Sequence, residues 1–127
     1  MLTTFPGTRV LIVEDELLVS WTTQDMLEAL GCVVIGPAAS VSQALETIAA
    51  QAIDAAVLDL NLSGELSYAV ADSLVSRGVP YVFLTGYNAA SIREGYGDAL
   101  ALQKPLRQGN LIDALARLLP PPRVAHG

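Results

Sequence analysis

Side chains that could bind a metal ion and a phosphoryl group stand just past the ends of the apolar runs of this chain. Glu14 and Asp15 follow one such run, and Asp59, Thr85 and Lys104 each follow another. Carboxylate oxygens are the hard ligands that Mg²⁺ prefers, and a hydroxyl and a lysine can donate to phosphoryl oxygens. These residues therefore predict a site where a divalent cation and a phosphoryl group meet.

Each of these residues also has an ordinary structural explanation. Acids such as Glu14 and Asp15 are favoured at a helix N-terminus by about 0.3–1 kcal/mol. Thr85 suits the change from strand to turn, and a lysine such as Lys104 is usually solvated. The combination favours chemistry, because three converging carboxylates repel one another and persist when a divalent cation neutralises them. An ionised carboxylate can attack phosphorus, which makes Asp59 the candidate nucleophile.

The apolar runs also predict the elements that carry these residues. Continuous apolar runs are typical of strands in a sheet that is covered on both faces. The predicted strands are residues 9–13, 33–35, 53–58, 79–84 and 100–103. The predicted helices are residues 16–30, 40–50, a segment from the Ser63-Gly64 loop to about residue 76, and residues 108–119. This alternation predicts a doubly wound α/β fold with a five-stranded parallel sheet flanked by helices. Ligands of such sheets bind beyond the carboxyl ends of the strands.

The second predicted helix begins with a capping pattern. Ser40 stands at its N-cap, and Gln43 completes the pattern of a capping box. Helical spacing predicts an inward stripe. Its members are Val41, Ala44, Leu45 and Ile48.

Size and composition limit the classes of protein to which the chain can belong. A chain of 127 residues suits one domain, which we place at residues 8–119, between a flexible segment (1–7) and a tail (120–127). Hydrophobic residues make up 52% and charged residues 16%, which is too apolar for a disordered chain. No apolar run approaches the ~20 residues that span a bilayer. No signal peptide is evident, so the default expectation is a cytoplasmic location.

Charge and cysteine content narrow the choice of partners. The net charge is −6, and the seven basic residues are scattered, which argues against binding to nucleic acid or to an anionic membrane. The single cysteine, Cys32, cannot form an internal disulfide. Its apolar neighbours predict a buried, structural side chain.

The motifs together resemble those of response-regulator receiver domains of two-component signalling. The matching residues are Glu14-Asp15, Asp59, Thr85-Gly86 and Lys104-Pro105, and the resemblance extends from residue 9 to residue 119. It implies a flavodoxin-like strand order, 2-1-3-4-5. It also implies a signalling phosphoacceptor rather than an enzyme, in which Asp59 accepts a phosphoryl group from a histidine kinase or a histidine phosphotransfer protein. Thr85 would move onto the phosphoryl oxygen, and Lys104 would pair with it.

The same resemblance implies a Mg²⁺ cofactor and its ligands. Asp15, Asp59 and the carbonyl of Asn61 would bind the ion, with Glu14 acting through water. The acceptor would serve as a relay intermediate, as a phosphate sink or as an allosteric binder of a partner protein.

A narrower resemblance is to the FAT GUY group of stand-alone receivers. Their Phe-Ala-Thr-Gly-Tyr run is similar to Phe-Leu-Thr-Gly-Tyr at residues 83–87, with Leu84 as the departure. Members of the group lack the usual aromatic switch on the fifth strand, in agreement with Ala101 here. Tyr87 is then the candidate switch, with covering of the pocket as the alternative. We expect a short or mobile helix over residues 88–98, which phosphorylation would order.

The first predicted helix presents a candidate docking surface. Its inward stripe consists of Val19, Thr23, Met26, Leu27 and Leu30. This stripe leaves Leu18 and Trp21 on another face, and an exposed Trp is informative. In receivers this helix resembles the surface that docks the helical bundle of the phosphodonor. Leu17, Leu18, Trp21 and Pro105 are therefore the predicted docking residues of a monomer or weak dimer. The alternative is that Trp21 folds back on Leu18 or seals an edge.

Two other functional classes remain at this point. A Mg-dependent phosphatase would also form an aspartyl-phosphate, but such enzymes usually carry a second acid where this chain has Asn61. A flavodoxin-like binder of a small ligand would need a phosphate-cradling loop after the first strand. The acids at residues 14–16 are wrong for an anionic cofactor.

Overall fold

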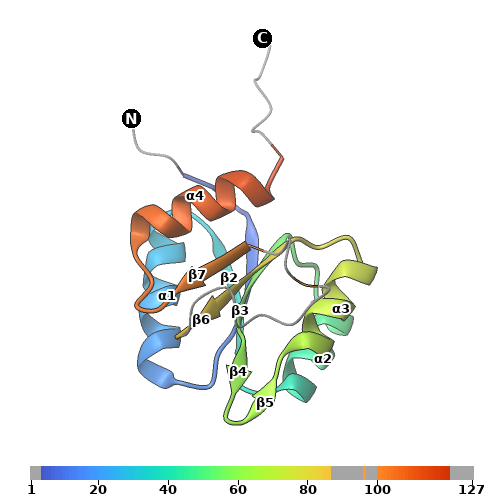
Figure 1. Cartoon of the computed structure of the whole chain (residues 1–127). Helices are drawn as coiled ribbons and strands as arrows, with labels where there is room; N and C mark the ends of the chain where they lie inside the picture. Colours follow the sequence, from blue (N-terminus) through green and yellow to red (C-terminus); the bar gives the residue numbers. More distant parts are fainter. Residues whose placement is uncertain (1–3, 87–95, 97–99, 121–127) are drawn as a thin grey trace.

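The computed structural model of the chain describes residues 4–86, 96 and 100–120. The described helices are α1 (Leu17–Ala29), α2 (Val41–Ala50), α3 (Tyr68–Ser76) and α4 (Gln108–Leu118). The described strands are β1 (Arg9–Val13), β2 (Val33–Ala38), β3 (Ala55–Asp59), β4 (Asn61–Leu62), β5 (Glu65–Leu66), β6 (Tyr81–Thr85) and β7 (Leu100–Gln103). Figure 1 shows the helices packed on both sides of a central sheet.

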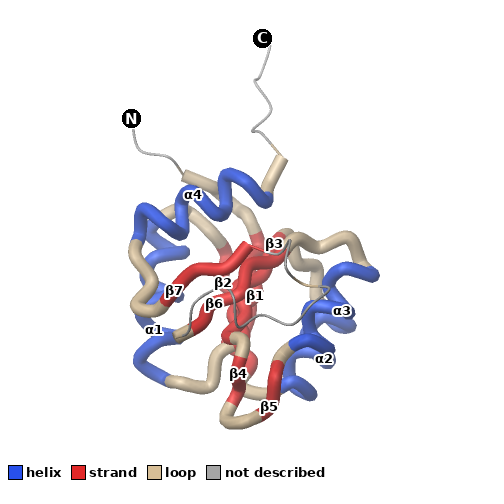
Figure 2. Tube along the Cα trace, viewed as in Figure 1, coloured by secondary structure: helices blue, strands red, loops and turns tan. Residues whose placement is uncertain are grey.

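The central sheet is parallel and has five strands in the order β2-β1-β3-β6-β7. Along the chain this is the order 2-1-3-4-5, so the predicted doubly wound fold is confirmed. Figures 1 and 2 show α1 and α4 on one face of the sheet and α2 and α3 on the other. Both faces are covered, which is why the strands read as unbroken apolar runs.

Alternate residues of each strand enter different halves of the core. On β1, Val10 and Ile12 pack with Leu27 of α1 and with Leu111 and Leu115 of α4. Their neighbours face the other way, into the cluster formed with α2 and α3. That cluster includes Leu11, Val13, Ala44, Ile48, Val70 and Leu74. The sheet is thus held from both sides by buried apolar contacts.

Several strand boundaries differ from the predicted ones. β2 continues to Ala38, through Gly36 at φ +93°, where an added Cβ would lie 2.9 Å from the Ala38 nitrogen. The close approach of that backbone therefore requires glycine. β3 includes Asp59 and β6 includes Thr85, so both residues are the last of their strands rather than the first beyond them. A short antiparallel hairpin, β4 and β5, stands where we predicted only a loop.

The predicted cap of α2 is confirmed, with one change. The Ser40 hydroxyl accepts a hydrogen bond from the Gln43 nitrogen at 3.2 Å. The Gln43 side chain returns to the Ala39 nitrogen at 2.9 Å, one residue earlier than in a standard capping box. The prediction that Leu45 belongs to the inward stripe was wrong, because it is 36% exposed. Only one narrow face of this ten-residue helix meets the sheet.

Backbone hydrogen bonds tie part of the N-terminal segment to the rest of the fold. In the segment 1–7, for which we expected flexibility, the Phe5 and Gly7 nitrogens donate hydrogen bonds to the Leu30 and Gly31 carbonyls.

Cys32 is buried, and burial raises the pKa of its thiol, in keeping with a structural role. Among the described helices, none has the length and apolar character needed to cross a bilayer.

Candidate functional site

Backbone hydrogen bonds at the carboxyl edge of the sheet bring the candidate residues together. The Glu14 nitrogen donates to the Ala38 carbonyl at 2.9 Å, at the end of β1 and β2. The Lys104 nitrogen donates to the Thr85 carbonyl at 2.8 Å, just beyond β7. Parallel strands all end at this edge, so residues far apart in the sequence meet there.

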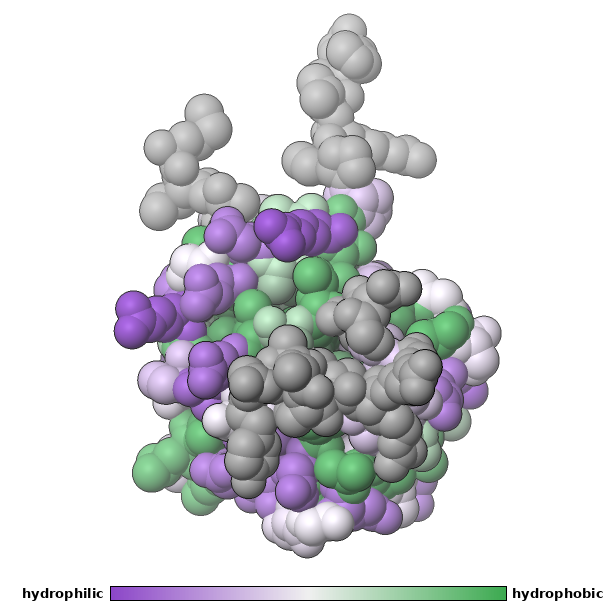
Figure 3. Space-filling model, viewed as in Figure 1, coloured by the Kyte–Doolittle hydropathy of each residue, from purple (hydrophilic) through white to green (hydrophobic). Residues whose placement is uncertain are grey.

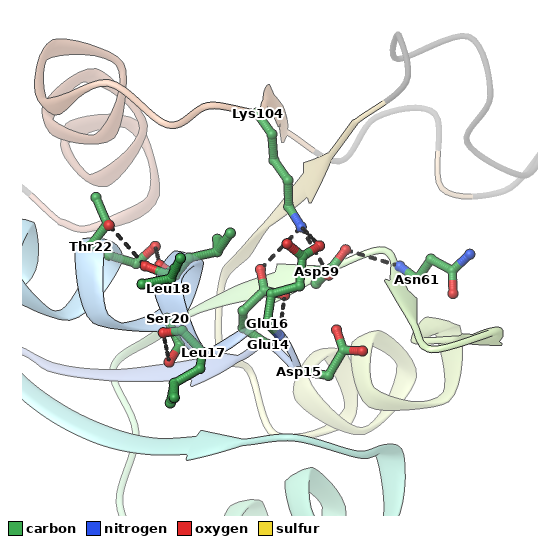
Figure 4. A network of polar contacts seen from close by, with 12 residues as sticks. Glu14, Asp15, Glu16, Leu17, Leu18, Ser20, Thr22, Asp59, Asn61 and Lys104 are labelled. Carbon is green, nitrogen blue, oxygen red and sulfur yellow. Dashed lines mark hydrogen bonds and ion pairs between the residues drawn. The ribbon is translucent and has the colours of Figure 1, made fainter.

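Lys104 is the cation at the centre of this cluster. Its Nζ atom lies 3.1 Å from Asp59 Oδ2, 3.2 Å from Glu14 Oε1 and 3.4 Å from Glu16 Oε1. Figure 4 shows these side chains converging from separate elements. Burial by itself lowers the pKa of Lys104, but the hydrogen bond and charge of Asp59, with the charge of Glu14, outweigh it and raise that pKa. The ammonium therefore stays charged.

Glu14 is a buried acid in an unfavourable environment. It is 4% exposed, and burial, together with the neighbouring Asp59, raises its pKa to about 7. Its Oε2 atom accepts from the Glu16 nitrogen at 3.2 Å. Its Oε1 atom meets Lys104 as an ion pair but has no hydrogen-bond partner among the described residues. The pocket therefore has acceptor capacity that the surrounding protein leaves unused.

Three carboxylates can offer oxygens to one ion at this place. Glu14, Asp15 and Asp59 each have a carboxylate oxygen within 4.8 Å of the others. The donors are all hard oxygens, Asp15 is partly exposed, and the buried Oε1 atom of Glu14 pairs with Lys104 but accepts no hydrogen bond from the described residues. These properties fit a hard divalent cation that keeps some of its waters.

The segment after Asp59 is tied to it by short hydrogen bonds. The Asn61 nitrogen donates to Asp59 Oδ1 at 3.1 Å, and the Ser67 hydroxyl donates to the Asp59 carbonyl at 2.7 Å. The Asn61 side-chain oxygen accepts from the Gly64 nitrogen at 2.7 Å, so the amide serves the turn. The Asp59 carboxylate is thereby held facing Lys104.

A small cleft opens beside Asp59. It measures about 170 Å³. Its lining consists of Asp59, Leu60, Asn61, Leu66, Tyr68, Thr85 and Gly86. Thr85 is 3% exposed and stands at the end of β6, one residue beyond Leu84, which pairs with Asp59 on the neighbouring strand. The predicted hydroxyl and acid therefore share one opening.

The remaining predicted residues lie beside the pocket or outside the described part of the chain. Leu17, Leu18 and Trp21 are 59%, 74% and 54% exposed on α1. Figure 3 shows hydrophobic side chains protruding at the lower left, where α1 begins in Figure 1. Pro105 is exposed, after a cis peptide bond with Lys104. Tyr87, the candidate switch, lies outside the described residues. The segment 88–98, for which we expected a short or mobile helix, also lies outside them, apart from Tyr96.

Sequence reasoning missed three residues that contact the site. Glu16 pairs with Lys104, Ser67 binds the Asp59 backbone, and the Ser63 hydroxyl donates to Asp15 Oδ2. The signal for Glu16 was its place directly after the acid pair. Ser63 and Ser67 follow Asp59 within a few residues, but the hairpin that turns them back toward the site had no distinct pattern.

Comparisons with known proteins agree with this geometry. The family model described as "Response regulator receiver domain" matches residues 10–116. The solution structure of SdrG from Sphingomonas melonis Fr1 is 41% identical, with a TM-score of 0.80, over 88% of this chain and 96% of that one. The BeF3-activated conformation of SdrG, from Pseudomonas melonis Fr1, is 39% identical, with a TM-score of 0.78, over 90% of this chain and 98% of that one.

A more distant likeness concerns the fold alone. The PhyR receiver domain of Erythrobacter litoralis is 24% identical, with a TM-score of 0.80, over 94% of this chain and 98% of that one. A search of curated proteins found no match to this chain. The acid cluster, its lysine, the fold and the family match together show that this chain belongs to the response-regulator receiver family.

Proposed function

We propose that Asp59 is the phosphoacceptor of this chain and takes its phosphoryl group from a phosphohistidine of a histidine kinase or phosphotransfer protein. The observation that carries the proposal is the buried Asp59 carboxylate, 3.1 Å from Lys104 and beside two further acids. A buried carboxylate at the open edge of a sheet, with a cation and an adjoining cleft, is suited to nucleophilic attack.

The chain's own groups account for the transfer. One Asp59 oxygen attacks phosphorus, the new O–P bond forms, and the P–N bond to the donor imidazole breaks, leaving its electron pair on nitrogen. Lys104 offsets the charge of the transferred oxygens, and the Thr85 hydroxyl donates to one of them from the end of β6. Positioning and charge neutralisation supply most of the catalysis in such transfers.

The acids of the pocket fit a Mg²⁺ ion. Asp15, Asp59 and the Asn61 carbonyl would hold it, with Glu14 acting through water. When bound, Mg²⁺ neutralises the acids and screens the phosphoryl oxygens from them. Lys104 alone cannot balance Glu14, Glu16 and Asp59, since one positive charge faces three carboxylates.

Two further features support the proposal, one for the acceptor and one for its partner. A relative with 39% identity has a BeF3-activated conformation, and beryllofluoride is a tetrahedral stand-in for a phosphoryl group. The exposed Leu17, Leu18 and Trp21 on α1, together with the exposed Pro105 next to Lys104, offer an apolar surface for the phosphodonor's helical bundle. The same reaction would serve a relay intermediate, a phosphate sink or an allosteric binder of a partner protein, because each role requires phosphorylation of Asp59.

The phosphatase alternative is less favourable here. Its second acid would stand at Asn61, whose side-chain oxygen is instead engaged by the Gly64 nitrogen. The flavodoxin-like alternative would place an anionic ligand against Glu14 and Asp15, where charge repulsion opposes it.

The proposal is tested by phosphorylating the protein with acetyl phosphate and Mg²⁺, and then with a panel of purified histidine kinases. Intact-protein mass spectrometry should detect one phosphoryl adduct in the wild type and in Asp113→Asn, an exposed control on α4. Asp59→Asn should remain unmodified. An adduct that persists in Asp59→Asn would assign the acceptor to another residue.

A further inference from the structure

The hairpin that follows Asp59 contains an unusual turn. β4 and β5 are joined by the two residues Ser63 and Gly64, at φ +52° and +93°. Two successive positive φ values are typical of a type I′ turn, in which asparagine or aspartate followed by glycine is preferred. Ser63 is the one residue other than glycine with positive φ in the described part of the chain. The backbone geometry of the turn therefore does not explain why serine occupies position 63.

The turn is fixed relative to the phosphoacceptor. The Gly64 nitrogen donates to the Asn61 side chain at 2.7 Å, and the Asn61 nitrogen donates to Asp59 Oδ1 at 3.1 Å. At the far end of the hairpin, the Ser67 hydroxyl donates to the Asp59 carbonyl at 2.7 Å. The Ser63 hydroxyl is therefore carried on a segment that is anchored to Asp59 at both ends.

That hydroxyl reaches Asp15, which lies 48 positions earlier in the sequence. The Ser63 Oγ atom donates to Asp15 Oδ2, and no other side chain in the described ranges bonds or pairs with this carboxylate. In Figure 4 the Asp15 carboxylate stands apart from the contacts that join Lys104 to Glu14 and Asp59. A carboxylate has two oxygen atoms that can each accept contacts. Because Ser63 contacts only Oδ2, the Oδ1 atom of Asp15 can still bind a cation.

We propose that Ser63 is a positioning residue for the metal site, whose hydroxyl holds Asp15 in the orientation that binds the cation. This inference rests on the proposed function, because it requires that the acids bind Mg²⁺. Groups that hydrogen-bond a metal-binding carboxylate orient it, and their removal typically weakens metal affinity by about 10- to 100-fold. The hairpin thereby couples the segment after the phosphoacceptor to the acid after β1.

The test is isothermal titration of the metal-free protein with MgCl₂. Ser63→Ala and Ser63→Gly both remove the hydroxyl, but they differ in their effect on the turn, since glycine relieves the cost of the positive φ and alanine, like serine, does not. We expect both variants to weaken Mg²⁺ binding by about 10-fold. Ser76→Ala, at the exposed end of α3, is the matched control and should bind as the wild type does.

The outcomes separate this inference from the proposed function. Wild-type protein that takes up no Mg²⁺ would overturn both. Wild-type binding with unchanged or tighter binding in both Ser63 variants would overturn the positioning role alone. A loss in Ser63→Ala with normal affinity in Ser63→Gly would also overturn it, because the turn and not the hydroxyl would then matter. Urea unfolding of each variant verifies that the titrations compare folded proteins.

Discussion

A single lysine side chain faces several acids at the carboxyl edge of the sheet. Lys104 contacts Glu14, Glu16 and Asp59, of which Glu14 and Asp59 are nearly inaccessible to water. Two buried carboxylates and one ammonium leave an excess of negative charge in a place where water screens it weakly. Burial, together with the neighbouring Asp59, raises the pKa of Glu14 here, and a proton on Glu14 relieves part of the excess charge.

The Glu14 pKa predicts how stability depends on pH in the absence of metal. The folded-state pKa of about 7 exceeds the ordinary 4.5, so the folded protein binds the extra proton in this window. The free energy of unfolding should therefore fall as pH rises from about 4.5 to about 7. One pKa unit corresponds to about 1.4 kcal/mol, so the loss should not exceed about 3.5 kcal/mol. Urea unfolding in chelator-treated buffer across this range measures it.

Glu14→Gln is the comparison for this experiment. The amide cannot ionise, so the variant should lose the pH-dependent fall and become more stable than the wild type at the alkaline end. Saturating Mg²⁺ should likewise suppress the fall in the wild type, because the ion takes the place of the proton. An equal fall in wild type and variant would show that another group is responsible.

At the scale of the elements, α1 combines a buried face with a group of exposed apolar side chains. Thr23, Leu27 and Leu30 are buried against the sheet, as the helical spacing predicted. Leu17, Leu18 and Trp21 remain largely exposed on the same helix. Exposed large apolar side chains grouped next to a site are typical of an interface.

Trp21→Ala and Leu18→Ala test the docking role of α1. Each should change the free energy of unfolding by no more than about 1 kcal/mol, because neither side chain is in the core. Each should slow phosphotransfer from a cognate histidine kinase at least about 10-fold, which is the expected effect of losing a residue that contributes about 1.4 kcal/mol to the complex. Stopped-time phosphotransfer assays with labelled kinase measure the rate.

Two controls make this result specific. Val75→Ala removes a side chain that is 63% exposed on α3, and it should leave the transfer rate unchanged. Phosphorylation by acetyl phosphate should be the same in all these variants, because a small donor needs no docking surface. Slowing with both donors would place the defect in the pocket instead.

At the scale of the whole molecule, one edge of the sheet collects residues that the chain separates widely. Glu14, Asp59 and Lys104 come from the ends of three different strands, and the parallel register places them within ion-pair distance. The two halves of the core hold these strands in place from opposite faces. Ligands that bind this edge should therefore stabilise the entire fold.

Mg²⁺ with beryllofluoride should raise the free energy of unfolding. A ligand at 100 times its dissociation constant adds about 2.7 kcal/mol by mass action. Thermal unfolding should show a higher midpoint with Mg²⁺ and a further rise with beryllofluoride. Asp59→Asn should lose the further rise caused by beryllofluoride, because an amide lacks the ionised carboxylate oxygen to which beryllium bonds. A beryllofluoride increment retained in full by Asp59→Asn would contradict the proposed acceptor.

The order of apolar runs along the chain was enough to predict the doubly wound sheet, its five strands and the edge at which the acids, Thr85 and Lys104 gather, because apolar runs and their ends are local patterns. Tertiary structure alone decided that Ser63 meets Asp15, that Glu16 joins the contacts of Lys104, and that Leu45 is exposed. Those outcomes depend on how a hairpin folds back and on which narrow helix face meets the sheet. The sequence carries no periodic pattern for either outcome, because contacts between residues far apart in sequence decide how the hairpin folds and how much of the helix is buried.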